Sequence, residues 1–300
     1  MKYVFFINMG GAENLQDCDV FLKNMFSDEY ILPIKNKLLR AFVGFMIRKS
    51  RLRAMQESYK HIGGKSPLND ITKKLCSKLD KDGFCFDFIN LYVKPFALDV
   101  LQKYEFKEDD EVVLFPLYPH HSQTTVTTSV VKVKEAIRLL NINSKLSVID
   151  IFYKDELYNE MLEKQILEAN ESFYPNEKKV LLFSAHSLPM SIIKRGDLYE
   201  KHINEHVKLL SKRLEKHFDS FLLGYQSKLG PVKWLEPNTG DLIERLDKKA
   251  IICPISFCID CSETVFELDI EYRKVAKEEY KVLECPNFRD DFVKFIESKL

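Results

Sequence analysis

The residues best suited to chemistry include a histidine at the end of an apolar run. Residues 180–189 read VLLFSAHSLP, which places His186 just after a run of apolar side chains. An apolar run without alternation predicts a strand that is buried on both faces, and Pro189 marks where extended structure ends. Because open parallel sheets bind ligands at the carboxyl ends of their strands, His186 is a candidate active-site residue. The alternative is a hydrogen-bonded loop histidine.

The second candidate is a row of carboxylates late in the chain. It consists of Asp260, Glu263, Glu267 and Glu271. These residues step by three, four and four, so on a helix they would share one face. Like charges at this spacing repel by about 0.2–0.5 kcal/mol per pair, so we expect a cation against them. Carboxylate oxygens suit divalent cations, and a row of them could pass on metal or protons. A solvated acidic face is the alternative.

The other cysteines and histidines carry less information. Seven cysteines, odd in number and scattered, argue against a disulfide framework and for a reducing compartment, with the cytoplasm as the default. Cys258 and Cys261 form a lone C-x-x-C pair, for which packing is the favoured interpretation. His202 and His206 have i, i+4 spacing, but they lie among Lys and Glu residues, and we predict that they are on the surface.

Charge and length limit the classes of function. The 45 basic and 45 acidic side chains give a net charge of zero, which argues against a nucleic-acid binder. A chain of 300 residues can form one large or two medium domains. No uninterrupted apolar stretch is long enough to span a membrane.

Apolar runs alternate with amphipathic segments along the chain. The predicted strands cover residues 3–8, 84–92, 112–117, 146–153, 180–184, 220–225, 250–255 and 280–283. This alternation predicts an α/β fold with mainly parallel sheets, and eight strands suit two lobes better than one sheet. No linker marks a boundary, and the spacing of the elements puts the division near residues 118–121.

Residues 37–53 combine an apolar stretch with a basic cluster. Residues 41–47 are almost wholly apolar, and four of the next six residues are Arg or Lys. This pattern suits a helix on an anionic membrane or against an acidic, flat, apolar ligand. An ordinary core helix with a solvated basic end is equally consistent with it.

Five motifs, taken in order, resemble those of the ferrochelatase family. Residues 184–189 resemble its S-A-H-x-x-P motif, and residues 225–239 its signature Y-Q-S-K/R-x-G-P-x-x-W-L-x-P-x-T. Residues 255–271 resemble its carboxylate helix. Residues 63–68 and 116–119 are also similar, so the resemblance spans nearly the whole chain.

The resemblance implies two Rossmann-like, chelatase-type lobes, each a mainly parallel sheet flanked by helices, with a cleft between them. We expect an N-terminal lobe over residues 1–119 and a C-terminal lobe over residues 120–286. Residues 287–300 are expected to pack back on the first lobe.

The resemblance also implies an activity, the insertion of ferrous iron into protoporphyrin IX to give protohaem. This nitrogen–metal lyase reaction is the last step of haem biosynthesis. His186 and Glu263 would be the catalytic pair, and both would contact metal together with Glu267 and Glu271. The implied substrate-binding residues are Met9, Tyr92, Ser122, Trp234, Phe257 and Asp260. Iron is a substrate here, and no permanently bound cofactor is expected.

Three positions depart from the family pattern. Leu91 stands where many relatives have Arg before the tyrosine, which puts one propionate contact in doubt. Cys261 stands where a histidine is common. Gln123 stands where relatives with an iron–sulfur cluster have cysteine, so we expect no cluster.

The resemblance leaves partners and alternatives open. Porphyrin and ferrous iron are the expected partners, the protein is expected to be a cytoplasmic monomer or weak homodimer, and the 38–53 stretch is a candidate for peripheral contact with the inner membrane. One alternative is a haem or porphyrin carrier without turnover. Another is a chelatase for coproporphyrin or for cobalt or nickel insertion. The order of events is also open: His186 is favoured as proton acceptor and Glu263 as metal or proton conduit, but the roles can be reversed.

Overall fold

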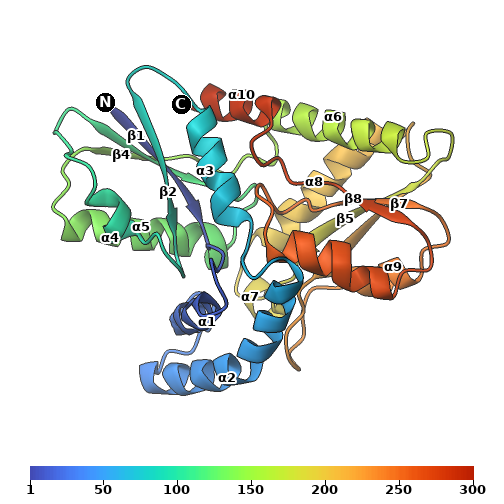
Figure 1. The fold of residues 1–300 in the computed structure, drawn as a ribbon, viewed down its shortest axis with the longest axis horizontal. Coiled ribbons are helices and arrows are strands. Elements are labelled where there is room, and N and C mark those ends of the chain that lie inside the picture. Colours follow the sequence, from blue (N-terminus) through green and yellow to red (C-terminus); the bar gives the residue numbers. More distant parts are fainter. The chain divides into compact units, whose positions relative to one another are not determined.

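Eight strands form two four-stranded parallel sheets in the computed structural model, which describes residues 1–300 (Figure 1). The strands are β1 (Lys2–Asn8), β2 (Phe84–Asn90), β3 (Glu111–Pro116), β4 (Lys145–Val148), β5 (Val180–His186), β6 (Ser220–Gln226), β7 (Ala250–Cys253) and β8 (Tyr280–Val282). Their order is β2-β1-β3-β4 in one sheet and β6-β5-β7-β8 in the other. All eight predicted strands are present, and the predicted α/β class is confirmed.

Helices connect the strands in both sheets. Those after β1 and before β5 are α1 (Asp17–Ser27), α2 (Lys37–His61), α3 (Leu68–Lys78), α4 (Ala97–Leu101), α5 (Thr128–Leu139) and α6 (Glu156–Ser172). Those after β5 are α7 (Met190–Ile193), α8 (Tyr199–Leu214), α9 (Thr239–Glu244) and α10 (Asp290–Ser298). Two π-helices, η1 (Gln123–Thr127) and η2 (Glu263–Glu271), follow β3 and β7, and a 3₁₀ turn, η3 (Tyr272–Lys274), follows η2.

The first strand shows why the sheets are buried on both faces. In β1, Tyr3, Phe5 and Ile7 pack into a core that includes residues of α4 and α5. Phe6 points to the opposite face, where its ring lies 5.5 Å from that of Phe115. Burying each such large apolar side chain stabilises the fold by about 1.5–3 kcal/mol. A continuous apolar run is therefore what this position in the sheet requires.

The chain divides into two units at a later point than predicted. The first unit consists of Met1–Tyr118, Ser122–Asp150 and Lys299, and the second of Pro119–His121, Ile151–Ser298 and Leu300. Residues 122–150, predicted in the C-terminal lobe, thus belong to the first unit. The physical reason is that β4 pairs with β3 and that α5, which connects them, packs on the same sheet. No change in composition accompanies the true boundary.

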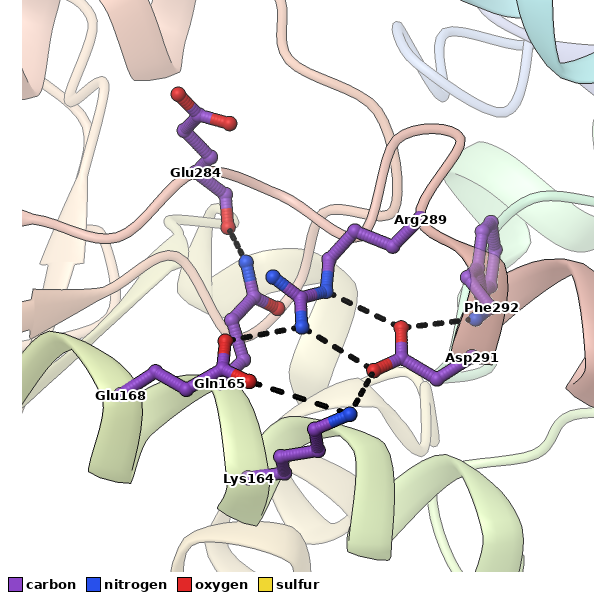
Figure 2. A network of polar contacts seen from close by, with 7 residues as sticks. All are labelled: Lys164, Gln165, Glu168, Glu284, Arg289, Asp291 and Phe292. Atoms are coloured by element: carbon purple, nitrogen blue, oxygen red, sulfur yellow. Dashed lines mark hydrogen bonds and ion pairs between the residues drawn. The ribbon is translucent and has the colours of Figure 1, made fainter.

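The C-terminal segment, predicted to pack on the first lobe, groups with the second unit except for Lys299. Within it, α10 lies beside α6 (Figure 1). Arg289 bonds to Glu168 on α6 at 3.0 Å and also pairs with Asp291 (Figure 2). Phe295 packs on Tyr158, with ring centroids 5.3 Å apart. Both polar and apolar contacts therefore hold α10 on α6.

Helix α2 lies against α1 (Figure 1). Most of its apolar residues are exposed. Asn36 caps its N-terminus, accepting hydrogen bonds from the main-chain N–H groups of Leu38 and Leu39. Gly44 allows the close approach to α1, since a Cβ there would lie 2.8 Å from the main-chain oxygen of Phe26. The exposed large apolar residues of α2 are Leu38, Leu39, Phe42, Phe45 and Met46. An ordinary core helix, the alternative considered from sequence, is therefore wrong for this stretch. No helix of the structure is both long and apolar enough to cross a bilayer.

Candidate active site

His186 lies where the sequence predicts it, at the carboxyl end of a strand. It is the last residue of β5, which pairs with β6 on one side and with β7 on the other. Its main-chain N–H donates to the Ser256 hydroxyl at 3.0 Å, which ties the end of β5 to the loop after β7. The side chain is partly exposed, whereas the strand before it is fully buried. The strand therefore presents an imidazole ring at the carboxyl end of the sheet. In folds of this kind, ligands bind at that end.

The carboxylate row begins in the loop after β7, and its first member is not part of the helix. Asp260 is buried and accepts hydrogen bonds from Thr264 Oγ1 at 2.7 Å and Asn287 Nδ2 at 2.6 Å. The main-chain N–H of Cys285 also points at its carboxylate, at 3.3 Å. The prediction that Asp260 shares a helical face with the glutamates was therefore wrong. Asp260 fixes the loop from which the helix starts.

The helix that carries the glutamates is a π-helix, η2, and Glu263 is its first residue. Its carboxylate accepts a hydrogen bond from Ser262 Oγ at 2.9 Å, and its main-chain oxygen accepts one from Gln226 Nε2 at 3.0 Å. The side chain is half-buried. π-Helical turns are rare in proteins, and those that occur are often found at functional sites. Glu263 thus combines a fixed backbone with a carboxylate that water and ligands can reach.

Glu267, one turn later, is bound tightly by the protein itself. Its Oε1 accepts from the main-chain N–H of Ser227 at 2.6 Å and from the Tyr272 hydroxyl at 2.6 Å. Its Oε2 accepts from the Ser227 hydroxyl and from Gln226 Nε2, the latter at 3.3 Å. All four donors are electrically neutral groups. They hold the carboxylate in place and leave its negative charge without a compensating cation.

Glu271 ends η2 and extends the negative charge toward solvent. Although the residue is exposed, partial removal of water from its carboxyl group raises its pKa, and the charge of Glu267 acts in the same direction. None of Glu263, Glu267 and Glu271 forms an ion pair with Lys or Arg. The neighbouring Asp269, by contrast, is paired with Arg273.

The predicted metal ligands do not form a ready-made metal site. No three His, Cys, Asp or Glu side chains of the structure come together so that they could hold a metal ion. The bonds to Glu267 explain part of this, because both its oxygens are already used.

Two of the predicted substrate-binding residues lie near these elements in the second unit. Phe257 is half-buried in the loop between β7 and η2. Trp234 is also half-buried, and its indole N–H donates to the main-chain oxygen of Leu229 at 2.8 Å. Residue 234 also makes a β-bridge with Pro189, three residues after His186. The structure therefore places Trp234 next to the segment that follows the histidine.

Three predicted substrate-binding residues, Met9, Tyr92 and Ser122, lie in the first unit. Met9 follows β1 directly and is partly exposed. Tyr92 is fully buried, and its hydroxyl donates to Asp28 at 2.8 Å. Ser122 is buried as the N-cap of η1, where its hydroxyl accepts from the main-chain N–H of Thr124. Of the three, only Met9 has a side chain that is free of such structural bonding and accessible.

Sequence reasoning missed the burial of two histidines. His202 and His206, predicted on the surface, are 6% and 0% exposed. His206 Nδ1 lies 2.9 Å from Nε2 of His120, and the other ring nitrogen of each histidine has no hydrogen-bond partner. Burial lowers the pKa of His206 to about 3 and that of His120 well below its ordinary value. The apolar residues Tyr199, Ile203, Leu210 and Leu214, which share a face of α8 with His206, were the signal that could have shown this face to be buried.

The structure supports packing as the role of the C-x-x-C pair. Cys258 and Cys261 are buried free thiols, and burial raises the pKa of both. Cys258 Sγ lies 3.9 Å from the Tyr158 hydroxyl. Protonated, buried thiols are poor nucleophiles and poor metal ligands.

Gln226 and Ser227 are further residues of the site that spacing alone does not reveal. Gln226 is fully buried at the end of β6, beside His186 in the sheet register. Ser227 has a positive φ of 66°, which is uncommon for a residue other than glycine and occurs preferentially at functional sites. Nothing in the periodicity of the sequence distinguishes a buried amide of this kind from a polar turn residue.

Comparison with known proteins gives one consistent result. The ferrochelatase family matches residues 2–300. A ferrochelatase of Campylobacter jejuni subsp. jejuni (strain 81-176) is 60% identical over 298 residues, which cover 99% of this chain and 96% of the relative. One from Campylobacter concisus (strain 13826) is 52% identical, covering 99% of this chain and 96% of the relative. One from a Nitratiruptor species is 43% identical, with 98% and 97% covered.

A solved structure is similar in fold. SirB from Bacillus subtilis with Fe3+ superposes with a TM-score of 0.53 and 9% sequence identity, covering 99% of this chain and 93% of that one. At this identity the likeness concerns the chelatase-type fold alone. The family match and the full-length relatives carry the assignment: the chain belongs to the ferrochelatase family.

Proposed function

We infer that this protein is a ferrochelatase that inserts ferrous iron into protoporphyrin IX, forming protohaem in the last step of haem biosynthesis. The family match over residues 2–300 carries this conclusion. The geometry of the second unit supports it, since His186 and the η2 glutamates follow two neighbouring strands of one sheet.

The reaction needs the two kinds of group that the site offers. Two pyrrole protons must leave the ring, and a divalent cation must replace them, so a base and oxygen ligands are both required. We propose that His186 accepts the protons and contacts the iron. Glu263, with Glu271 beyond it, would then guide iron or protons along η2, since neither glutamate forms an ion pair with Lys or Arg. Glu267 contributes its charge from a fixed position.

For substrate contact we propose Met9, Trp234 and Phe257, the accessible residues of the predicted set. Apolar side chains suit a flat macrocycle and can favour a bent form of it in which the nitrogen lone pairs point toward the metal. Tyr92, Ser122 and Asp260 are buried and bonded within the protein. We propose that each of these three acts indirectly, by fixing the backbone around it within its own unit.

The test is incubation with ferrous iron and either protoporphyrin or coproporphyrin under reducing, anaerobic conditions. We expect the free-base absorbance of protoporphyrin to fall as metalloporphyrin forms. Faster turnover of coproporphyrin would reassign the substrate within the same reaction. Tight binding of both porphyrins without metallation would instead make the protein a carrier.

We also propose that α2 docks on an anionic membrane surface. Leu38 and Phe42 are 83% and 63% exposed. Large apolar side chains that are exposed together to water are unfavourable and mark interaction surfaces. Of the basic residues on α2, Arg40 and Arg48 are paired with acidic residues. Lys37, Lys49, Arg51 and Arg53 form no ion pair and remain available to lipid phosphates. An apolar face beside unpaired cations is the pattern of an interfacial helix.

Flotation with lipid vesicles tests this docking. We expect the protein to float with vesicles that contain anionic lipid and to float less with neutral vesicles or at high salt. Phe42→Ser should weaken flotation, whereas Leu139→Ser, which alters an equally exposed apolar residue on α5, should not. Equal loss in both variants, or none in either, would contradict the proposal.

A further inference from the structure

Gln226 connects the two elements that carry the candidate catalytic residues. It is the last residue of β6 and is fully buried, and in the sheet register it lies opposite His186. Its side-chain amide has an acceptor end and a donor end. The two ends bind different parts of the second unit.

The acceptor end faces the strand that bears the histidine. Gln226 Oε1 accepts a hydrogen bond of 2.7 Å from the hydroxyl of Ser184, two residues before His186. The Ser184 hydroxyl in turn lies 2.9 Å from that of Thr239, the first residue of α9. The orientation of the amide is fixed at its other end, because its two partners there are a main-chain oxygen and a carboxylate oxygen, which can only accept.

The donor end faces η2. Gln226 Nε2 donates to the main-chain oxygen of Glu263 at 3.0 Å and to Oε2 of Glu267 at 3.3 Å. Both hydrogens of the amide are thereby used on the helix. The bond to Glu263 acts on its backbone and leaves its carboxylate free.

The next residue strengthens this connection. Ser227 donates its main-chain N–H and its hydroxyl to Glu267, and its positive φ is the conformation that allows this. A positive φ is unfavourable for a residue other than glycine, so the surrounding contacts must hold Ser227 in this conformation. Residues 226 and 227 together attach the end of β6 to both turns of η2.

We infer that Gln226 is a positioning residue for metal insertion, setting where Glu263 stands relative to His186. The inference rests on the proposed function, since it concerns the same reaction. Gln226 reaches neither the carboxylate of Glu263 nor the imidazole of His186 in any bond described above. It acts through the strand on one side and through the helix backbone on the other.

The chain offers a matched control for a buried glutamine. Gln165 on α6 is also buried, and its Nε2 donates to a main-chain oxygen, that of Glu284, at 2.8 Å (Figure 2). It lies in the same unit but bonds to the segment before α10 and to no residue of the site. A substitution at Gln165 therefore measures what the loss of a buried amide costs in general.

The experiment compares Gln226→Leu and Gln226→Glu with Gln165→Leu and Gln165→Glu. Each Glu variant keeps the shape of the side chain and an acceptor oxygen but loses the amide donor. We expect both substitutions at Gln226 to lower kcat for iron insertion by roughly 10²-fold, the effect of misplacing a catalytic group by about 1 Å, with little change in the KM for porphyrin. The pH profile of kcat should shift as well, because the carboxylates of η2 change their surroundings. Both Gln165 variants should keep the kcat and pH profile of the wild type while losing thermal stability to a similar degree.

Several outcomes would decide the question. If the wild type metallates porphyrin and the two sets of variants have equal kcat, Gln226 is a structural residue only. A change confined to KM would also overturn the inference, since it would point to substrate binding. If Gln226→Leu does not fold, the isosteric Gln226→Glu carries the test under the same criteria. Failure of the wild type itself to metallate porphyrin would be a failure of the proposed function, which the first measurement detects separately.

Discussion

The two units repeat one sheet topology and differ in the residues that it presents. In the first sheet, β1 and β2 end with Asn8 opposite Asn90, and in the second, β5 and β6 end with His186 opposite Gln226. In both, the strand on the other side of the central strand leads into a π-helix, which opens with Gln123 in η1 and with Glu263 in η2. The topology thus supplies the same positions twice. Only the second unit fills them with a titratable ring and a carboxylate.

The two units also differ in how they balance the charge of a carboxylate that is buried or half-buried. Burial opposes ionisation of Asp28 in the first unit, but its bonds to Lys132 and Thr128 outweigh this and lower its pKa. Lys132 Nζ lies 2.7 Å from the carboxylate and balances its charge. Glu267 in the second unit is held by neutral donors instead. The first unit thus pairs its buried carboxylate with a lysine, whereas the second unit leaves the charge of Glu267 unpaired.

The largest expected effect is that of removing the histidine. We predict that His186→Ala lowers iron insertion by about 10²–10⁴-fold, the usual contribution of a positioned acid or base, while porphyrin still binds in an absorbance titration. His217→Ala, which removes an exposed histidine of the same unit, should leave the rate unchanged. Near-normal activity of His186→Ala would show that His186 is not required for iron insertion. The comparison of the two units would then lose its main catalytic difference.

A smaller pair of effects separates catalysis from stability in the two units. We predict that Glu263→Gln lowers kcat strongly but changes the free energy of unfolding by less than about 0.5 kcal/mol, as for a surface substitution. Asp28→Asn should instead lower the free energy of unfolding by about 1–3 kcal/mol, because Lys132 and Tyr92 lose their charged partner. Urea unfolding and turnover of both variants check this. The contrast between the units fails if Asp28→Asn, measured while folded, loses as much kcat as Glu263→Gln.

The smallest predicted effect is a pH dependence of stability that arises in the second unit. His120 and His206 are neutral when folded, whereas in the unfolded chain they would titrate near the ordinary value of 6.5. The unfolded state therefore binds more protons in this range, so stability is complete above about pH 6.5 and is lost as pH falls toward about 3.

Urea unfolding at pH 7.5 and at pH 5.5 measures this pH dependence of the unfolding free energy. Trp234, the single tryptophan, lies in the second unit and reports on it by fluorescence. We expect His206→Phe to reduce the difference in unfolding free energy between the two pH values, and His217→Phe to keep it. Equal differences in wild type and His206→Phe would assign the acid sensitivity elsewhere.

Most of the strands could be predicted from sequence because they are short runs of β-branched, aromatic or other apolar residues, which a sheet covered on both faces accommodates. The π-helical form of η2 could not be predicted. Over its nine residues, the spacing of Glu263, Glu267 and Glu271 is compatible with an α-helix as well as with a π-helix. The boundary between the units lies after β4, a short strand of mixed polarity, and no linker composition marks it.

The catalytic candidates could be located from sequence, but not their supporting bonds. His186 and Glu263 follow apolar strands, a pattern that spacing reveals. Gln226 and Ser227 each act on η2 through two hydrogen bonds between elements that are about 40 residues apart. Such bonds depend on how the strand and the helix pack, and no periodicity in the sequence records them. The burial of His206 was missed for a related reason, since the charged residues around it lie on the other side of α8.

The packing at Gly44 has a consequence for how α2 is aimed. The 25 residues of this helix extend over roughly 37 Å at about 1.5 Å per residue, and the contact at Gly44 lies a third of the way along it. Any larger side chain there would push against the backbone of α1 and make the helix pivot about that point. Because the helix is rigid, a small tilt about residue 44 produces a larger displacement at the C-terminal end of α2. The absence of one side chain thus sets the direction in which the exposed apolar residues point.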